Sequence, residues 1–75
     1  MTAKDKQLLQ RQAYRLAILG ITVERERSKL KRLVARGVSY DDQEMLQALN
    51  RFRTVDSEWK QLEVEHLQLK RKLET

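Results

Sequence analysis

Few residues of this sequence could catalyse a reaction or hold a metal ion. The chain contains one histidine, His66, no cysteine and only two glycines, so it has no glycine-rich phosphate loop. A zinc site needs several His or Cys ligands at close spacing, and acid–base catalysis needs paired groups held in a pocket. His66 has no second ligand spaced near it. We therefore predict no catalytic residue, no metal site, no cofactor and no small-molecule substrate.

The residues that predict binding are large apolar side chains and cations in the first half of the chain. Residues 16–21 would be apolar on nearly every side of a helix. A helix of that kind requires burial on every side, and an exposed apolar patch usually marks an interface. We predict a contact surface for a protein partner or a second copy, with cations that steer association. Its residues are Tyr14, Ile18, Leu19, Ile21, Arg25, Lys29 and Arg32.

Two long helices would carry these residues. The chain has no proline, and 36% of its residues are charged, which is typical of solvent-exposed helices. In the first helix, about residues 7–36, the predicted seam consists of Leu9, Ala13, Leu16, Gly20, Val23, Arg27, Leu30 and Val34. In the second, about residues 40–73, it consists of Met45, Ala48, Phe52, Val55, Trp59, Leu62, His66, Leu69 and Leu73. Both alternate by three and four residues, as the a and d positions of a coiled coil do. Residues 1–6 are predicted to be polar and frayed.

A turn is predicted at residues 37–39. Gly37 suits the left-handed position just past a helix end, and Val38 suits the apolar position that folds back on the last turn. Ser39 would then cap the second helix, with Asp42 three residues on. A short loop makes the helices antiparallel neighbours, so facing residues should have numbers that sum to about 75–78. Gly20 would then make room for Trp59 or Val55, or else act as a hinge.

The predicted fold class is therefore all-α, an antiparallel, coiled-coil-like hairpin that forms a single domain over residues 1–75. A chain of this size rarely builds a strongly stabilising core. We expect self-association or a partner to complete it. The longest apolar run, residues 16–23, is too short to span a membrane. A cytoplasmic location is expected.

Charge and the apolar patch each leave an alternative open. Residues 1–36 carry ten basic and three acidic side chains, whereas residues 37–75 carry six and eight. An outward basic stripe is predicted on the first helix, formed by Arg11, Arg15, Arg25, Lys29, Arg32 and Arg36. Such a stripe can follow phosphates or an acidic protein face. The chain could accordingly be a basic nucleic-acid-binding bundle. The apolar patch gives the other alternative, two hairpins that self-associate into a four-helix bundle over Tyr14, Ile18 and Ile21, with an uncharacterised or regulatory role.

One family pattern is also present. Leucines precede an Arg-Gly helix ending, and glutamines follow it, at Leu30, Leu33, Arg36, Gly37, Gln43 and Gln47. In these residues the chain resembles the small E-type co-chaperones of bacterial type III secretion needles, which are short helical hairpins. The resemblance covers about half of the chain. It implies a cytoplasmic partner of a helical-repeat chaperone, the two together keeping the needle subunit from polymerising early.

Overall fold

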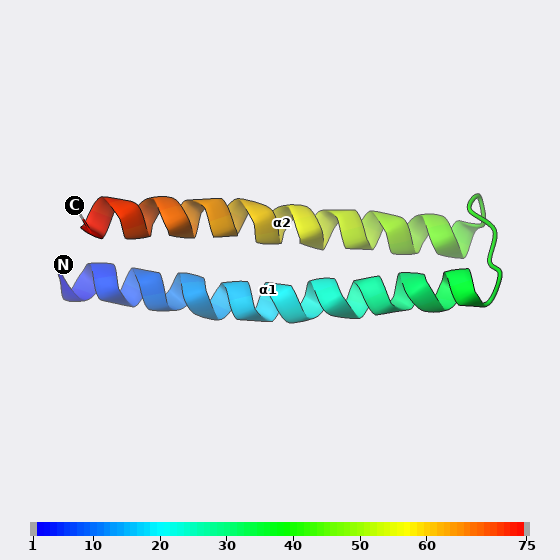
Figure 1. Cartoon of the computed structure of the whole chain (residues 1–75), viewed down its shortest axis with the longest axis horizontal. Helices are drawn as coiled ribbons and strands as arrows, with labels where there is room; N and C mark the ends of the chain where they lie inside the picture. The colour runs from blue at the N-terminus through cyan, green and yellow to red at the C-terminus, as the bar shows by residue number, and fades with distance from the viewer. Residues whose placement is uncertain (1, 75) are drawn as a thin grey trace.

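The protein is an antiparallel hairpin of two long helices. The computed structural model describes residues 2–74, with α1 at Ala3–Ala35 and α2 at Gln43–Glu74. The helices lie side by side along their whole length, and the start of α1 and the end of α2 lie together at the end opposite the turn (Figure 1). The molecule measures 52 × 15 × 14 Å. The all-α hairpin is confirmed, and the described residues contain no strand.

The start of α1 lies earlier than the sequence pattern indicated. Thr2 is the N-cap, and its side-chain oxygen accepts a hydrogen bond from the backbone N–H of Asp5 at 3.1 Å. The Asp5 carboxylate accepts from the backbone N–H of Thr2 at 3.4 Å. This reciprocal pair is a capping box, which satisfies two backbone donors. The expected frayed start is therefore wrong for residues 3–6, which are helical, and Met1 lies outside the described residues.

The end of α1 is a Schellman motif, as predicted. Gly37 has φ of 77°, the left-handed conformation that glycine adopts without a Cβ penalty. The N–H of Val38 donates to the carbonyl of Leu33, and the N–H of Gly37 donates to that of Val34, both at 3.0 Å. Val38 folds back against the buried residues Leu33 and Met45. This closure turns the chain and fixes α2 beside α1.

The start of α2 differs from the prediction. Ser39 does not cap the helix, because its hydroxyl donates to the Asp41 carboxylate at 2.5 Å and its carbonyl accepts a turn hydrogen bond from Asp42. The Asp42 side chain instead accepts from the backbone N–H of Glu44 at 2.9 Å, in the N-cap position. Helix α2 consequently begins at Gln43, three residues after the expected start.

The inner face of α2 agrees with its predicted seam. All nine seam residues are buried or half-buried, with Met45, Ala48 and Leu62 the most enclosed. Met45 and Ala48 form a core cluster with Leu33 of α1 near the turn. This end of the hairpin is where apolar burial is concentrated.

The inner face of α1 is rotated from the predicted seam. Leu9, Leu16, Val23 and Leu30 face α2 as expected, but the residues between them are Gln12, Leu19, Glu26 and Leu33. Ala13, Arg27 and Val34 are exposed, so three of the four alternate seam positions were predicted wrongly, whereas Gly20, the fourth, is half-buried beside Trp59. Leu19 and Leu33 bury more apolar surface than Gly20 and Val34 would, which favours the observed rotation.

Contacts between the helices fix their register. Nδ1 of His66 lies 2.9 Å from Oε1 of Gln12, and a Cβ added to Gly20 would lie 3.5 Å from Nε1 of Trp59. These pairs have numbers that sum to 78 and 79, the first at the upper limit of the predicted range of 75–78 and the second just above it. Trp59 does lie beside Gly20, but 3.5 Å is ordinary van der Waals contact. The lack of a side chain at Gly20 is therefore not required by packing.

Candidate interaction surface

The candidate site is a stripe of large apolar side chains on the outer face of α1. Tyr14, Ile18 and Ile21 are 70%, 47% and 58% exposed. They are spaced by four and three residues, so they lie on one stripe of the helix, with the exposed Ala17 between them. A shallow depression beside Tyr14 is lined by Gln7, Gln10, Arg11, Tyr14 and Arg15. We call Tyr14, Ile18 and Ile21 the outer apolar stripe.

Leu19 does not belong to this stripe. It is half-buried, because the rotation of α1 turns it toward α2 in the place that was predicted for Gly20. The contact surface predicted from the sequence therefore loses Leu19, which contributes to the hairpin's own packing. Ile18, its neighbour in sequence, keeps its outward position.

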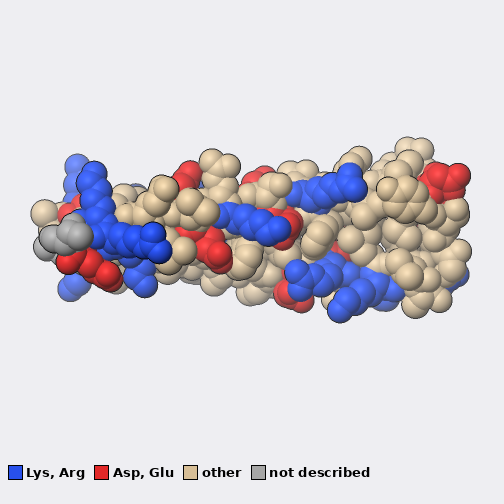
Figure 2. Space-filling view, turned by 45° about the horizontal axis from the view of Figure 1, so that its top comes forward, with Lys and Arg blue, Asp and Glu red and all other residues tan. Residues whose placement is uncertain are grey.

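Cations lie at both ends of the outer apolar stripe. Arg11 and Arg25 continue it by one turn in each direction, and Arg15 lies beside it; all three are exposed. Within residues 2–74, none of these three arginines forms an ion pair. On the face drawn in Figure 2, groups of Lys and Arg lie among Asp and Glu side chains and uncharged surface. The charges beside the apolar stripe are thus available to another molecule.

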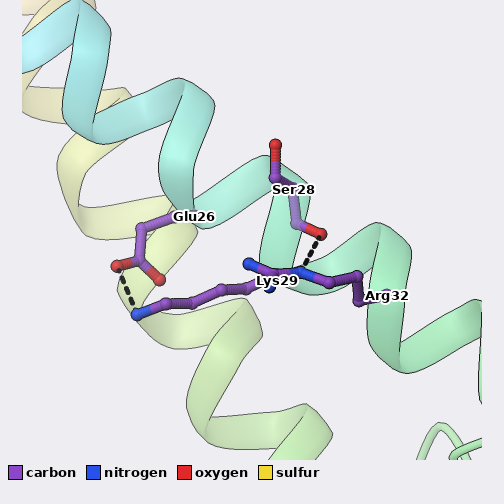
Figure 3. A network of polar contacts seen from close by, with 4 residues as sticks. All are labelled: Glu26, Ser28, Lys29 and Arg32. Carbon is purple, nitrogen blue, oxygen red and sulfur yellow. Dashed lines mark hydrogen bonds and ion pairs between the residues drawn. The ribbon is translucent and has the colours of Figure 1, made fainter.

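The other two predicted cations have contacts within α1. The Nζ of Lys29 lies 3.5 Å from Oε1 of Glu26, and Nε of Arg32 donates to the Ser28 carbonyl at 3.5 Å (Figure 3). Glu26 is buried on the inner face of α1, at 8% exposed, and its Oε2 has no hydrogen-bond partner. The ammonium group of Lys29 therefore interacts with a buried carboxylate of its own helix.

The basic side of α1 continues into a groove near the turn. A groove of about 290 Å³ lies between the helices, where Arg36 of α1 is 3.9 Å from the Glu44 carboxylate of α2. It is lined by Lys29, Arg32, Leu33, Arg36, Glu44, Ala48 and Arg51. Four cations and one carboxylate give this groove a positive potential.

Arg27 was predicted to lie in the α1 seam, but its contacts place it beside the seam. Its guanidinium pairs with Glu24 on the same helix at 2.6 Å and lies 6.0 Å from the Phe52 ring centroid. Arg27 forms no ion pair with Asp56 or Glu58 of α2, because it lies beside the seam and not in it. Asp56 pairs with Lys60 at 2.9 Å instead.

A second exposed apolar pair lies on α2. Val64 and Leu67 are 53% and 46% exposed and three residues apart. Lys60 and Arg71 continue this stripe in either direction at four-residue spacing. Sequence reasoning could have included this pair, because both residues fall outside the clear α2 seam.

Two further findings concern metal binding and membrane insertion. No three His, Cys, Asp or Glu side chains among residues 2–74 lie close enough to hold a metal ion. Neither α1 nor α2, over the part of the chain that is described, has an apolar segment long enough to cross a bilayer.

Comparison with known proteins gives no match. No protein-family model, no curated protein and no solved structure is significantly similar to the chain.

Proposed function

We propose that this chain is a non-enzymatic module that works by binding another protein through the outer apolar stripe of α1. The observation that carries the proposal is the exposure of Tyr14, Ile18 and Ile21 on one stripe, 70%, 47% and 58% respectively. Three large apolar side chains in a row on a small charged protein are typical of an interface. Their positions are independent of the hairpin's own packing, which uses the opposite face.

The small core also supports this proposal. Only five apolar residues of the described chain are buried, and none has a side chain that is completely enclosed. A core of this size contributes little stability on its own, and association is a common way in which short helical proteins are completed. Burial of the outer apolar stripe would add stabilisation of about 25 cal/mol for each Å² removed from water.

The experiment compares two variants that add the same charge to different helices. Ile18→Asp places a carboxylate in the outer apolar stripe, and Ser57→Asp places one on an exposed position of α2. The mass of the complex purified from the chain's native cells is measured by light scattering after size exclusion. Ile18→Asp should lose the complex while its helical circular dichroism persists, and Ser57→Asp should keep it. Equal complexes from both variants would contradict the proposal.

The co-chaperone role implied by the family resemblance is a more specific form of the same proposal. Among the residues that carry it, Leu33 is a core residue and Gly37 closes the Schellman motif, so both have a structural role in the hairpin. The specific test is co-expression with a helical-repeat chaperone and a needle subunit. A stable ternary complex that keeps the needle subunit soluble would support it, and a failure to form one would remove it.

Nucleic-acid binding is a second candidate, favoured by the positions of six cations. Arg11, Arg15, Arg25, Lys29, Arg32 and Arg36 follow one side of α1. A cationic stripe of this length can follow a phosphate backbone, with affinity that falls steeply as salt rises. Salt-sensitive retention on both DNA and heparin would support this candidate. It ranks second because the apolar side chains of Tyr14, Ile18 and Ile21 have no role in binding phosphates.

A further inference from the structure

The residues around the outer apolar stripe indicate what kind of partner fits it. Arg11, Tyr14, Ile18, Ile21 and Arg25 follow one another at three- and four-residue spacing, so a cation ends the apolar stripe at each end. We infer that the partner of this surface is an amphipathic helix of another protein whose apolar stripe is flanked by carboxylates. This inference rests on the proposed function and specifies the partner's chemistry.

The charges beside the stripe are not neutralised within the hairpin. Arg11, Arg15 and Arg25 form no ion pair in the described part of the chain. The carboxylate of Glu24, which directly precedes Arg25 in sequence, is held 2.6 Å from Arg27 on another side of α1. Arg15 lines a shallow depression with Glu58 and Glu65 of α2 but forms an ion pair with neither. A partner that covers the stripe must therefore meet unpaired cations, and opposite charges there raise both association rate and specificity.

A second copy of this chain does not supply those opposite charges. If two α1 helices crossed antiparallel at Ile18, Tyr14 would approach Ile21 of the second copy, and Arg11 would approach Arg25. A parallel pairing would bring each arginine to its own equivalent. Like charges placed opposite each other disfavour an interface. The outer stripes of two α1 helices are therefore poorly matched.

The exposed stripe of α2 has the same pattern of charge. Val64 and Leu67 are followed and preceded at four-residue spacing by Arg71 and Lys60. Pairing α1 of one copy with α2 of another would bring Arg11 or Arg25 toward Arg71, whereas Lys60 at the other end is already paired with Asp56 at 2.9 Å. Neither end of the Val64 and Leu67 stripe therefore offers a carboxylate to the arginines of α1, and the complementary helix comes from a different, acidic chain.

A helical partner fits the geometry of the surface as well as its charge. The apolar residues occupy about two turns of a straight helix, which matches the i, i+4, i+7 anchors of helix-to-helix recognition. The small side chain of Ala17 lies between them and lets a facing helix approach closely. Further toward the turn, the groove lined by Lys29, Arg32, Arg36 and Arg51 extends the positive surface along the same side.

The test uses two designed helical peptides as probes. Both carry three leucines at the spacing of the outer apolar stripe. One has glutamates on either side of the leucines, and the other has lysines at the same positions. Fluorescence anisotropy gives the affinity of each peptide for the full chain. We expect the glutamate peptide to bind at least about tenfold more tightly, with affinity that falls as ionic strength is raised.

Charge-reversal variants locate the effect. Arg11→Glu with Arg25→Glu should reverse the preference between the peptides. Arg53→Glu with Lys70→Glu makes the same change of net charge on exposed positions of α2 and should leave the preference unchanged. Equal effects of the two double variants would overturn the inference, because the preference would then reflect net charge and not the ends of the α1 stripe.

Ile18→Asp separates this inference from the proposed function. If both peptides bind equally well and both are lost in Ile18→Asp, the surface binds helices but has no acidic preference, so the inference alone fails. A homodimer that dissociates in Ile18→Asp would likewise overturn the acidic partner while leaving the surface in place. If the peptides bind Ile18→Asp as tightly as the native chain, both fail.

Discussion

Gln12 and His66 face each other across the hairpin, with Oε1 of the glutamine 2.9 Å from Nδ1 of the histidine. They are 54 residues apart in sequence, and each occupies a half-buried position in its seam. Because the amide oxygen Oε1 of Gln12 can only accept a hydrogen bond, Nδ1 of His66 is the donor. This contact near the open end, with the Schellman motif at the other, sets the register of two long helices.

The pair predicts a measurable coupling. In a double-mutant cycle with Gln12→Ala and His66→Ala, we expect a coupling free energy of about 0.5–1.5 kcal/mol, the usual net contribution of a neutral hydrogen bond. Urea unfolding followed by circular dichroism measures each variant. Strictly additive effects would show that the contact does not stabilise the hairpin.

The two glycines predict opposite responses to the same substitution. Gly37→Ala should destabilise the hairpin by about 1–2 kcal/mol, because φ of 77° forces a Cβ into the disfavoured left-handed region. Gly20→Ala should stabilise it by up to about 1 kcal/mol, since glycine weakens a helix interior and the added Cβ meets only Nε1 of Trp59 at 3.5 Å.

The free energy of unfolding of both variants, measured under one set of conditions, checks this. A stabilising Gly37→Ala would argue against the Schellman ending. A strongly destabilising Gly20→Ala would restore the interpretation in which Gly20 makes room for Trp59.

The buried Glu26 lowers the stability of the hairpin, so an apolar residue at this position should raise the free energy of unfolding. Its Oε2 is buried without a hydrogen-bond partner, and Oε1 has only the partly exposed Lys29 at 3.5 Å. Replacing such a carboxylate by an apolar side chain removes its desolvation cost. Glu26→Leu should therefore raise the free energy of unfolding by about 1 kcal/mol. Lys29→Leu serves as the control, because it leaves the buried carboxylate without its cation and should destabilise.

The loop predicts a local dependence on pH. The Ser39 hydroxyl, which donates to Asp41, and the backbone N–H of Asp41 hold the pKa of the Asp41 carboxyl below its ordinary value. A lowered pKa in the folded state stabilises the fold above the unfolded-state pKa, and this contribution is lost as pH falls through the folded-state pKa. In Ser39→Ala, the pKa of Asp41 should rise toward its ordinary value in a carbon NMR titration of the carboxyl group. An unchanged pKa would show that the hydroxyl is not its main cause.

Much of the hairpin follows from local patterns in the sequence. The α2 seam is unambiguous because only one set of positions alternates by three and four without a gap. Gly37 and Val38 predict the Schellman ending, because a left-handed residue followed by an apolar one has few other uses. Thr2 and Asp5 carry a capping-box spacing, and attention to it would have given the correct start of α1.

The sequence did not determine how α1 is rotated about its own axis. Leu9, Leu16, Val23 and Leu30 belong to both possible seams, so only the residues between them distinguish the two. One choice puts a glycine and an arginine in the seam, and the other a glutamine and a glutamate. The decision depends on how well Leu19 and Leu33 pack against α2, which is a tertiary effect. The observed rotation of α1 places Leu19 against α2, outside the predicted contact surface, and leaves Tyr14, Ile18 and Ile21 on that surface.

The central claim is that association covers the outer apolar stripe, and thiol labelling tests it directly. Because the chain has no cysteine, Ile21→Cys and Ser57→Cys each introduce a single reactive group, one on the stripe and one on α2. The rate of alkylation is compared between the complex from native cells and the purified hairpin. We predict that the Ile21→Cys thiol is protected in the complex and reactive in the isolated hairpin, whereas the Ser57→Cys thiol reacts equally in both. Equal rates for Ile21→Cys in the two states would contradict the account.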